Sequence, residues 1–84
     1  MNTIGTISVH TVTPAMKKGA EVTRKLVEYY HKEQLGNSDV KVSTEWDFNY
    51  PNPVIVVTAT TGGKDFYYCY EWRANLGCAL LIKD

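Results

Sequence analysis

The stretch DFYYCYEWRANLGCALLIKD, residues 65–84, decides how this chain folds. Residues 66, 68, 70 and 72 are all aromatic and would share one face of a β-strand, because side chains alternate along a strand. The letters ANLG at 74–77 indicate a turn, and residues 78–83 indicate a second strand. The stretch therefore predicts an antiparallel hairpin, and it raises the question of what the aromatic rings face.

Two more strands are expected before this hairpin. Residues 40–48 alternate between apolar and polar side chains, the pattern of a half-buried strand. The segment NYPNP at 49–53 is a turn, since two prolines cannot continue a hydrogen-bonded ladder. Residues 54–61 form a β-branched run, and Gly62-Gly63 suits a tight two-residue reversal into the aromatic strand.

A single helix is predicted from Pro14 to Leu35, capped by Thr13 and stopped by Gly36. Gly19 would permit a close approach to the sheet. Charged side chains take the outer face, with favourable spacing for the pairs Glu21–Lys25 and Glu28–Lys32. The apolar face, at helical spacing, consists of Met16, Gly19, Val22, Thr23, Leu26, Val27 and Tyr30.

Ile4 to Val12 indicates a further strand before the helix, with Ile7 and Val9 facing inward. The fold class is then α+β in two layers, with one amphipathic helix on a four- to five-stranded, mostly antiparallel sheet. The element order is β-α-β-β-β-β. At 84 residues, the chain is expected to form a single compact domain over 1–84.

The composition limits the classes of binding partner that are expected. Nine basic residues balance nine acidic ones, so nothing favours a phosphate backbone or an anionic membrane. The basic excess falls on the helix, with five Lys or Arg against three Glu at 14–35, so a basic groove beside the aromatic strand is not expected. No signal peptide or membrane-length apolar run is recognisable. We therefore expect a cytoplasmic protein.

Reaction machinery is scarce in the sequence. TTGGKD at 60–65 lacks the spacing of a phosphate-binding loop and is explained as a hairpin turn. His10 and His31 have no metal-ligand spacing around them and are interpreted as solvated or incidental histidines. Glu45 and Asp47 share one strand face, which is interpreted as solvated. We expect no enzyme, no catalytic residue, no cofactor and no metal.

Cys69 and Cys78 lie on the two strands of the hairpin. A turn centred at residues 73 and 74 would bring them opposite one another and allow a disulfide. A turn near Asn75-Leu76 separates them, and this register is favoured by Gly77. The cysteines are therefore interpreted as buried free thiols.

The rings at 66, 68, 70 and 72 are expected to build the core beneath the helix. One helix cannot cover a whole sheet, so apolar surface must remain on it. We expect protein-binding residues on the aromatic strand, and the candidates are Tyr67, Glu71, Trp72 and Arg73.

The sequence thus favours a non-catalytic protein-binding module, a small inhibitor or regulator of the kind that phages and mobile elements encode. It would dock through the aromatic sheet face or a strand edge. The alternative is a homodimer whose interface is the uncovered sheet face. Nucleic-acid stacking on the rings fits the charge distribution less well.

Overall fold

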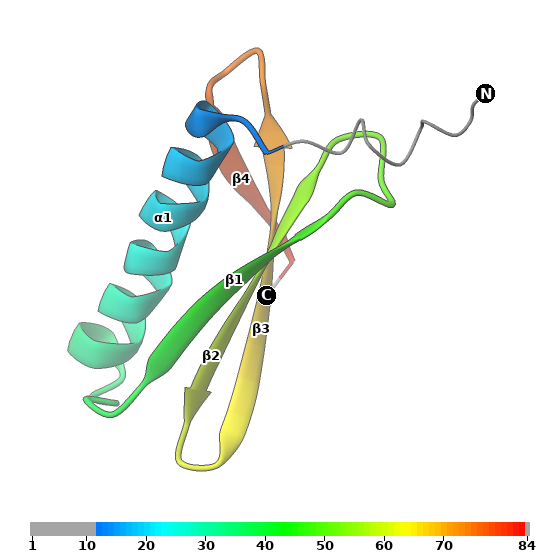
Figure 1. The fold of residues 1–84 in the computed structure, drawn as a ribbon. Coiled ribbons are helices and arrows are strands. Elements are labelled where there is room, and N and C mark those ends of the chain that lie inside the picture. Colours follow the sequence, from blue (N-terminus) through cyan, green and yellow to red (C-terminus); the bar gives the residue numbers. More distant parts are fainter. Residues whose placement is uncertain (1–11, 84) are drawn as a thin grey trace.

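The computed structural model describes residues 12–83, which form one helix packed on one face of a four-stranded antiparallel sheet (Figure 1). The helix α1 spans Pro14–Tyr29 and continues into a single π-helical turn, η2, at Tyr30–Gln34. The strands β1 to β4 follow in chain order, and they are adjacent in the same order in the sheet. Their bounds are Lys41–Asp47, Val54–Thr61, Lys64–Arg73 and Cys78–Lys83.

The predicted α+β class is confirmed, as are the four strands after the helix. The leading strand expected at residues 4–12 falls outside the described residues, except for Val12, which belongs to no strand. Strand register confirms the predicted faces of the aromatic strand: Tyr70 lies opposite Ile55, and Tyr68 lies opposite Val57. Ile55 and Val57 are fully buried beneath α1, so the even-numbered rings share the helix-covered face.

Thr13 caps α1 as predicted, because its Oγ1 accepts a hydrogen bond from the backbone N–H of Met16 at 3.2 Å. The α-helical part ends at Tyr29, earlier than the predicted Leu35. The N–H of Leu35 donates to the carbonyl oxygen of Tyr30, five residues back, which closes the π-helical turn.

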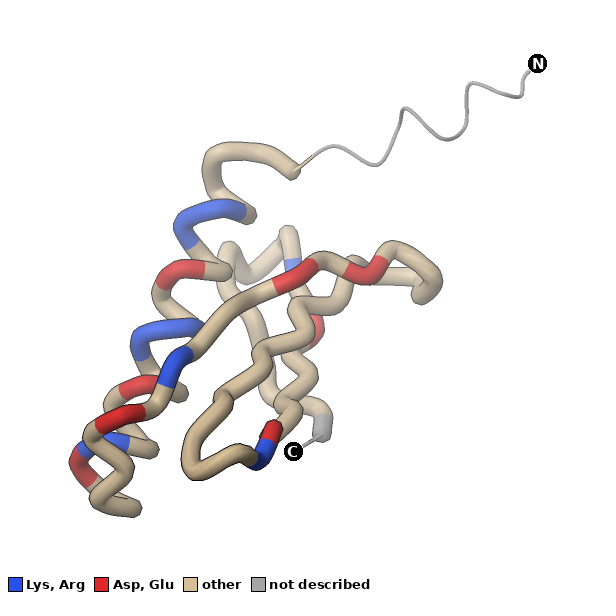
Figure 2. Tube along the Cα trace, turned by 60° about the horizontal axis from the view of Figure 1, so that its bottom comes forward, with Lys and Arg blue, Asp and Glu red and all other residues tan. Residues whose placement is uncertain are grey.

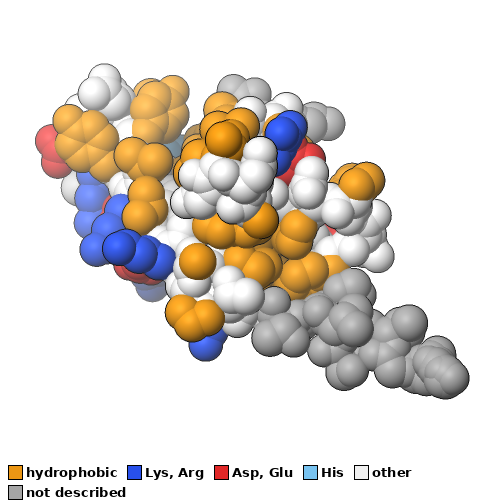
Figure 3. Space-filling model, turned by 90° about the horizontal axis from the view of Figure 1, so that it is seen from above, with side chains coloured by type: hydrophobic (Ala, Val, Ile, Leu, Met, Phe, Trp, Pro, Cys, Tyr) orange, Lys and Arg blue, Asp and Glu red, His pale blue; other side chains and the backbone are white. Residues whose placement is uncertain are grey.

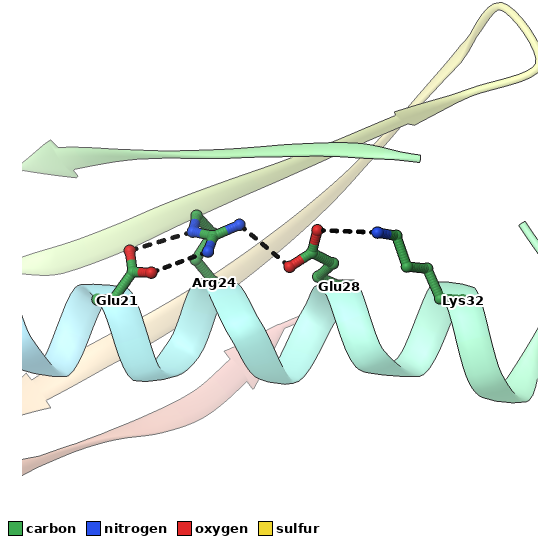
Figure 4. A network of polar contacts seen from close by, with 4 residues as sticks. All are labelled: Glu21, Arg24, Glu28 and Lys32. Carbon is green, nitrogen blue, oxygen red and sulfur yellow. Dashed lines mark hydrogen bonds and ion pairs between the residues drawn. The ribbon is translucent and has the colours of Figure 1, made fainter. Parts of the chain in front are cut away.

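Charged residues alternate in sign along α1 (Figure 2). Arg24 bridges Glu21 at 2.8 Å and Glu28 at 3.3 Å, and Lys32 binds the other oxygen of Glu28 (Figure 4). The predicted pair Glu28–Lys32 is confirmed. Glu21 instead forms its ion pair with Arg24, one turn along the same face.

The predicted apolar face of the helix is wrong on one flank. The buried side chains are Met16, Ala20, Thr23, Val27 and His31. In contrast, Val22, Leu26 and Tyr30 are 51%, 58% and 45% exposed. Small residues at the contact, such as Gly19 and Ala20, allow the helix to approach the sheet closely, and Val22, Leu26 and Tyr30 remain on its flank.

The interpretation of His31 as a solvated or incidental histidine is also wrong. Its exposed fraction is 0%, and its ring lies between α1 and the sheet. His31 follows Val27 by four residues and therefore continues the buried row of the helix.

The two cysteines are free, as interpreted, and they are not opposite one another in the hairpin. Cys78 pairs with Arg73, and Cys69 pairs with Lys83. The expected burial is wrong for Cys78, which is exposed at the start of β4, and Cys69 is half-buried.

Candidate functional site

A hollow lies between α1 and the last two strands. We call it the α1–β4 groove. Leu26 and Tyr30 form its helical wall, and Phe66, Tyr70 and Leu81 form its floor, around a volume of about 760 Å³. It is mostly apolar, with Asp65 at its rim.

A second hollow of about 440 Å³ continues the groove toward the start of α1. Leu26 and Tyr70 line both hollows, and Val22 and Ala79 extend the wall and the floor. Seen from the end where α1 begins, hydrophobic side chains are exposed across the molecule, while Lys and Arg gather on the helix side (Figure 3). The groove therefore runs along the helix as one apolar trough.

The position of α1 explains why the groove exists. The helix packs mainly on β1 and β2, so the helix-side face of β3 and β4 is only partly covered. The residues Val22, Leu26 and Tyr30 are spaced four apart and form one row along the flank of α1 that faces this open part. Phe66 and Leu81 remain 39% and 52% exposed on the floor.

A buried polar cluster fixes the floor of the groove. The amide nitrogen of Asn37, which can only donate, lies 3.3 Å from His31 Nδ1. Nδ1 therefore accepts, and Nε2 donates to the Tyr68 hydroxyl oxygen at 2.7 Å. The ring of Phe66 lies against the same imidazole, with 5.2 Å between ring centroids. His31 thus orients two adjacent rings beneath the groove from a fully buried position.

The other face of β3 carries three of the four residues predicted to bind a partner. Tyr67 is 57% exposed, and Glu71 and Arg73 form an ion pair at 2.6 Å. Hydrogen bonds from Arg73, and then from Asn52, hold the pKa of Glu71 below its usual range. This face is therefore more polar than the groove, and its residues Glu71 and Arg73 are already paired with each other.

The fourth predicted residue, Trp72, lies in the core on the opposite face. Its exposed fraction is 5%, and its ring packs against the backbone of Gly19 in α1. A partner would have to displace the helix to reach the indole. Trp72 is thus not brought together with Tyr67, Glu71 and Arg73, and we assign it to the packing between helix and sheet.

Within the described residues, no three His, Cys, Asp or Glu side chains are grouped as metal ligands. Over the same part of the chain, no helix is long and apolar enough to cross a membrane. Comparison of the chain with protein-family models, with curated proteins and with solved structures found no match. A function is therefore inferred from the geometry of the groove and of the sheet.

The sequence pattern did not identify Leu26, Tyr30 and Leu81 as site residues, because it placed the first two in the core and gave Leu81 no role. Two signals in the sequence pointed toward the groove. Val22, Leu26 and Tyr30 recur at four-residue spacing, and residues 78–82 are apolar on both faces of their strand.

Proposed function

We propose that this protein is a non-catalytic protein-binding module, and that its docking site is the α1–β4 groove. The observation that carries the proposal is the exposed apolar row of Val22, Leu26 and Tyr30 beside the half-covered floor of Phe66 and Leu81. Contiguous apolar surface of this kind is typical of protein interaction sites.

The shape of the groove favours an amphipathic helix of the partner as its occupant. Two adjacent strands are roughly 10 Å wide, which matches the diameter of a helix with its side chains. The row along α1 offers ridges at helical spacing against which a second helix packs. An apolar face of Leu, Ile or Met would fill the trough, and polar residues of the partner would face solvent.

Capture experiments with matched variants test this proposal. Leu26→Asp places a charge in the wall of the groove at a side chain that is 58% exposed, so the fold should be retained. Leu80→Asp is the control, since Leu80 is 42% exposed on the other face of the sheet, opposite Glu71, and does not line the groove. We expect the wild type and the Leu80 variant to retain one protein from a lysate of the native host, and the Leu26 variant to lose it.

A peptide covering a helix of the captured protein should then bind the wild type and fail to bind the Leu26 variant. Loss of capture with Leu80→Asp, and not with Leu26→Asp, would place docking on the Glu71–Arg73 face and contradict the groove. Capture that neither substitution affects would contradict both surfaces.

The alternative homodimer through the uncovered sheet face stays a prediction. Tyr67 and Leu80 provide exposed apolar area for such an interface. The charged residues Lys41, Glu45 and Asp47 lie along the same face on β1, and they weaken the case for a dry face-to-face contact. The inhibitor or regulator role likewise stays a prediction, to be decided by the identity of the captured protein.

A further inference from the structure

The two edges of the sheet differ sharply in chemistry. The edge strand β1 contains Lys41, Glu45 and Asp47, which are the kind of charges that protect an edge from pairing. The opposite edge strand, β4, has no charged residue from position 78 to position 82 and contains no proline. Within residues 12–83, no strand pairs with its outer side.

Apolar side chains stand exposed on both faces of β4. Leu80 is 42% exposed on the face away from the helix, and Leu81 is 52% exposed on the helix face. Ile82, at the end of the strand, is 55% exposed. An exposed apolar edge of this kind is a template for another strand.

The backbone of β4 can be assigned to its two sides. The Trp72 N–H donates to the Pro53 carbonyl oxygen at 2.8 Å, so the backbone groups of Trp72 point toward the β2 side of β3. Ala79 lies opposite Trp72, and Leu81 lies opposite Tyr70. Because hydrogen bonding alternates along an antiparallel pair, the N–H and C=O groups of Ala79 and Leu81 point to the open edge.

We infer that β4 pairs antiparallel with β4 of a second copy, about a two-fold axis at Leu80. Outward-pointing residues of one copy pair with outward-pointing residues of the other, and the register that uses both of them pairs Ala79 with Leu81 of the second copy and Leu80 with itself. This register uses residues 79–81, which lie before the register shift at Cys69/Tyr70, and it leaves Lys83 outside the paired stretch.

The second copy fits this edge for reasons of charge and symmetry. The paired stretch is neutral and its side chains are self-complementary, and the whole chain has zero net charge, so two copies do not repel. The two-fold axis is perpendicular to the sheet, which places both α1 helices on the same side. The inference does not depend on the proposed partner, although a dimer would present two grooves on one surface.

The association is expected to be weak, because the paired stretch is short and its interface lies at the small end of the range for specific complexes. Sedimentation equilibrium of the full chain up to about 0.5 mM, well into the range of weak interfaces, should show a shift from 9.5 kDa toward twice that mass. Leu80→Lys sets like charges opposite each other and should abolish the shift. Leu76→Lys is the matched control, since Leu76 is 57% exposed in the 74–77 turn, and it should leave the shift unchanged.

Cross-linking tests the register. In a chain with Cys69→Ala and Cys78→Ser, Leu80→Cys should form an intermolecular disulfide under mild oxidation. The two Cα atoms would be roughly 4.5 Å apart in a non-hydrogen-bonded pair, within disulfide range. Glu45→Cys in the same background places the thiol on the β1 edge and should not cross-link.

Amide hydrogen exchange of Ala79 and Leu81 distinguishes a second copy from the chain itself as the occupant of the β4 edge. Protection that increases with protein concentration supports the second copy. Protection in a strictly monomeric sample means that the chain covers its own edge, and this overturns the inference. It is also overturned by a dimer that survives Leu80→Lys and dissociates with Leu26→Asp, because such a dimer uses the groove. A chain that stays monomeric to the highest concentration, with both amides exchanging freely, overturns it as well.

Discussion

Gly19 of α1 and Trp72 of β3 lie so close together that the helix can only approach the sheet here without a side chain. A Cβ atom at position 19 would lie 2.5 Å from Cζ3 of the Trp72 ring and 3.2 Å from Cε3. The indole is 5% exposed, so it has little room to move aside. This contact fixes the distance between the first turns of α1 and the sheet.

Gly19→Ala should therefore lower the free energy of unfolding, although alanine is the better helix former. The gain in helix propensity is about 1 kcal/mol, and overpacking of a buried ring costs about 1–3 kcal/mol. We expect a net loss of up to about 2 kcal/mol in urea denaturation.

The same substitution in a Trp72→Phe background is the control for the Gly19 prediction. The smaller ring should relieve the overlap, so Gly19→Ala should there be neutral or stabilising by up to about 1 kcal/mol. An increase in stability from Gly19→Ala in the wild type would contradict the proposed contact.

The same contact explains why the sequence predicted the helix well and its buried face less well. Capping by Thr13 and the interruption at Gly36 are local signals, and they indicated where the helix begins and where it can end. The buried face is decided by distance to the sheet, and close packing at Gly19 and Ala20 rotates larger residues such as Leu26 outward. The hydrophobic pattern of a sequence carries no information about the distance between helix and sheet.

Removal of the Tyr68 hydroxyl should destabilise the protein. In Tyr68→Phe the Nε2 donor of His31 loses its acceptor in a site with an exposed fraction of 0%. An unsatisfied buried donor costs about 1–3 kcal/mol, and we expect a decrease of that size in thermal or urea unfolding. Tyr67→Phe is the matched control, because its hydroxyl makes a 3.4 Å contact to Asp65 at the surface and should matter by less than about 0.5 kcal/mol. Equal effects of the two substitutions would argue against the buried donor.

The turn between β2 and β3 should accept asparagine at its first position. Gly62 and Gly63 have φ angles of 58° and 76°, and two consecutive positive φ values are typical of a type I′ turn, for which Asn-Gly is the preferred pair. Gly62→Asn should raise the free energy of unfolding by about 0.5 kcal/mol by restricting the unfolded chain. Gly62→Val should lower it by about 1 kcal/mol or more, since a β-branched residue is strained at positive φ. Equal stability of both variants would contradict this turn geometry.

The candidate site was harder to predict from sequence than the fold. Alternation placed Tyr67 and Trp72 on opposite faces of β3, but it does not say which face a single helix covers or how far it extends across the sheet. Trp72 became a core residue because α1 begins directly above it. The groove opened because the same helix lies toward β1 and β2, which depends on tertiary packing.

Acid should weaken the protein through the network on α1. Hydrogen bonding by Arg24 lowers the pKa of Glu21, and Lys32 is the main cause that lowers the pKa of Glu28. A carboxyl group with a lower pKa in the folded state stabilises that state above the ordinary glutamate pKa of about 4.3, and the stabilisation is lost as the pH falls below it. The urea midpoint should therefore fall between neutral pH and pH values below about 4, and added salt should reduce the change because these groups are exposed.

Arg24→Gln should flatten this acid dependence, because it removes the cation that binds both glutamates. Lys17→Gln makes the same change of charge on the exposed side of α1, outside this network, and should leave the slope nearly unchanged. Urea midpoints of the three proteins across the acid range provide the comparison. If Arg24→Gln and Lys17→Gln flatten the dependence equally, the net charge of the helix is responsible and the specific ion pairs are not.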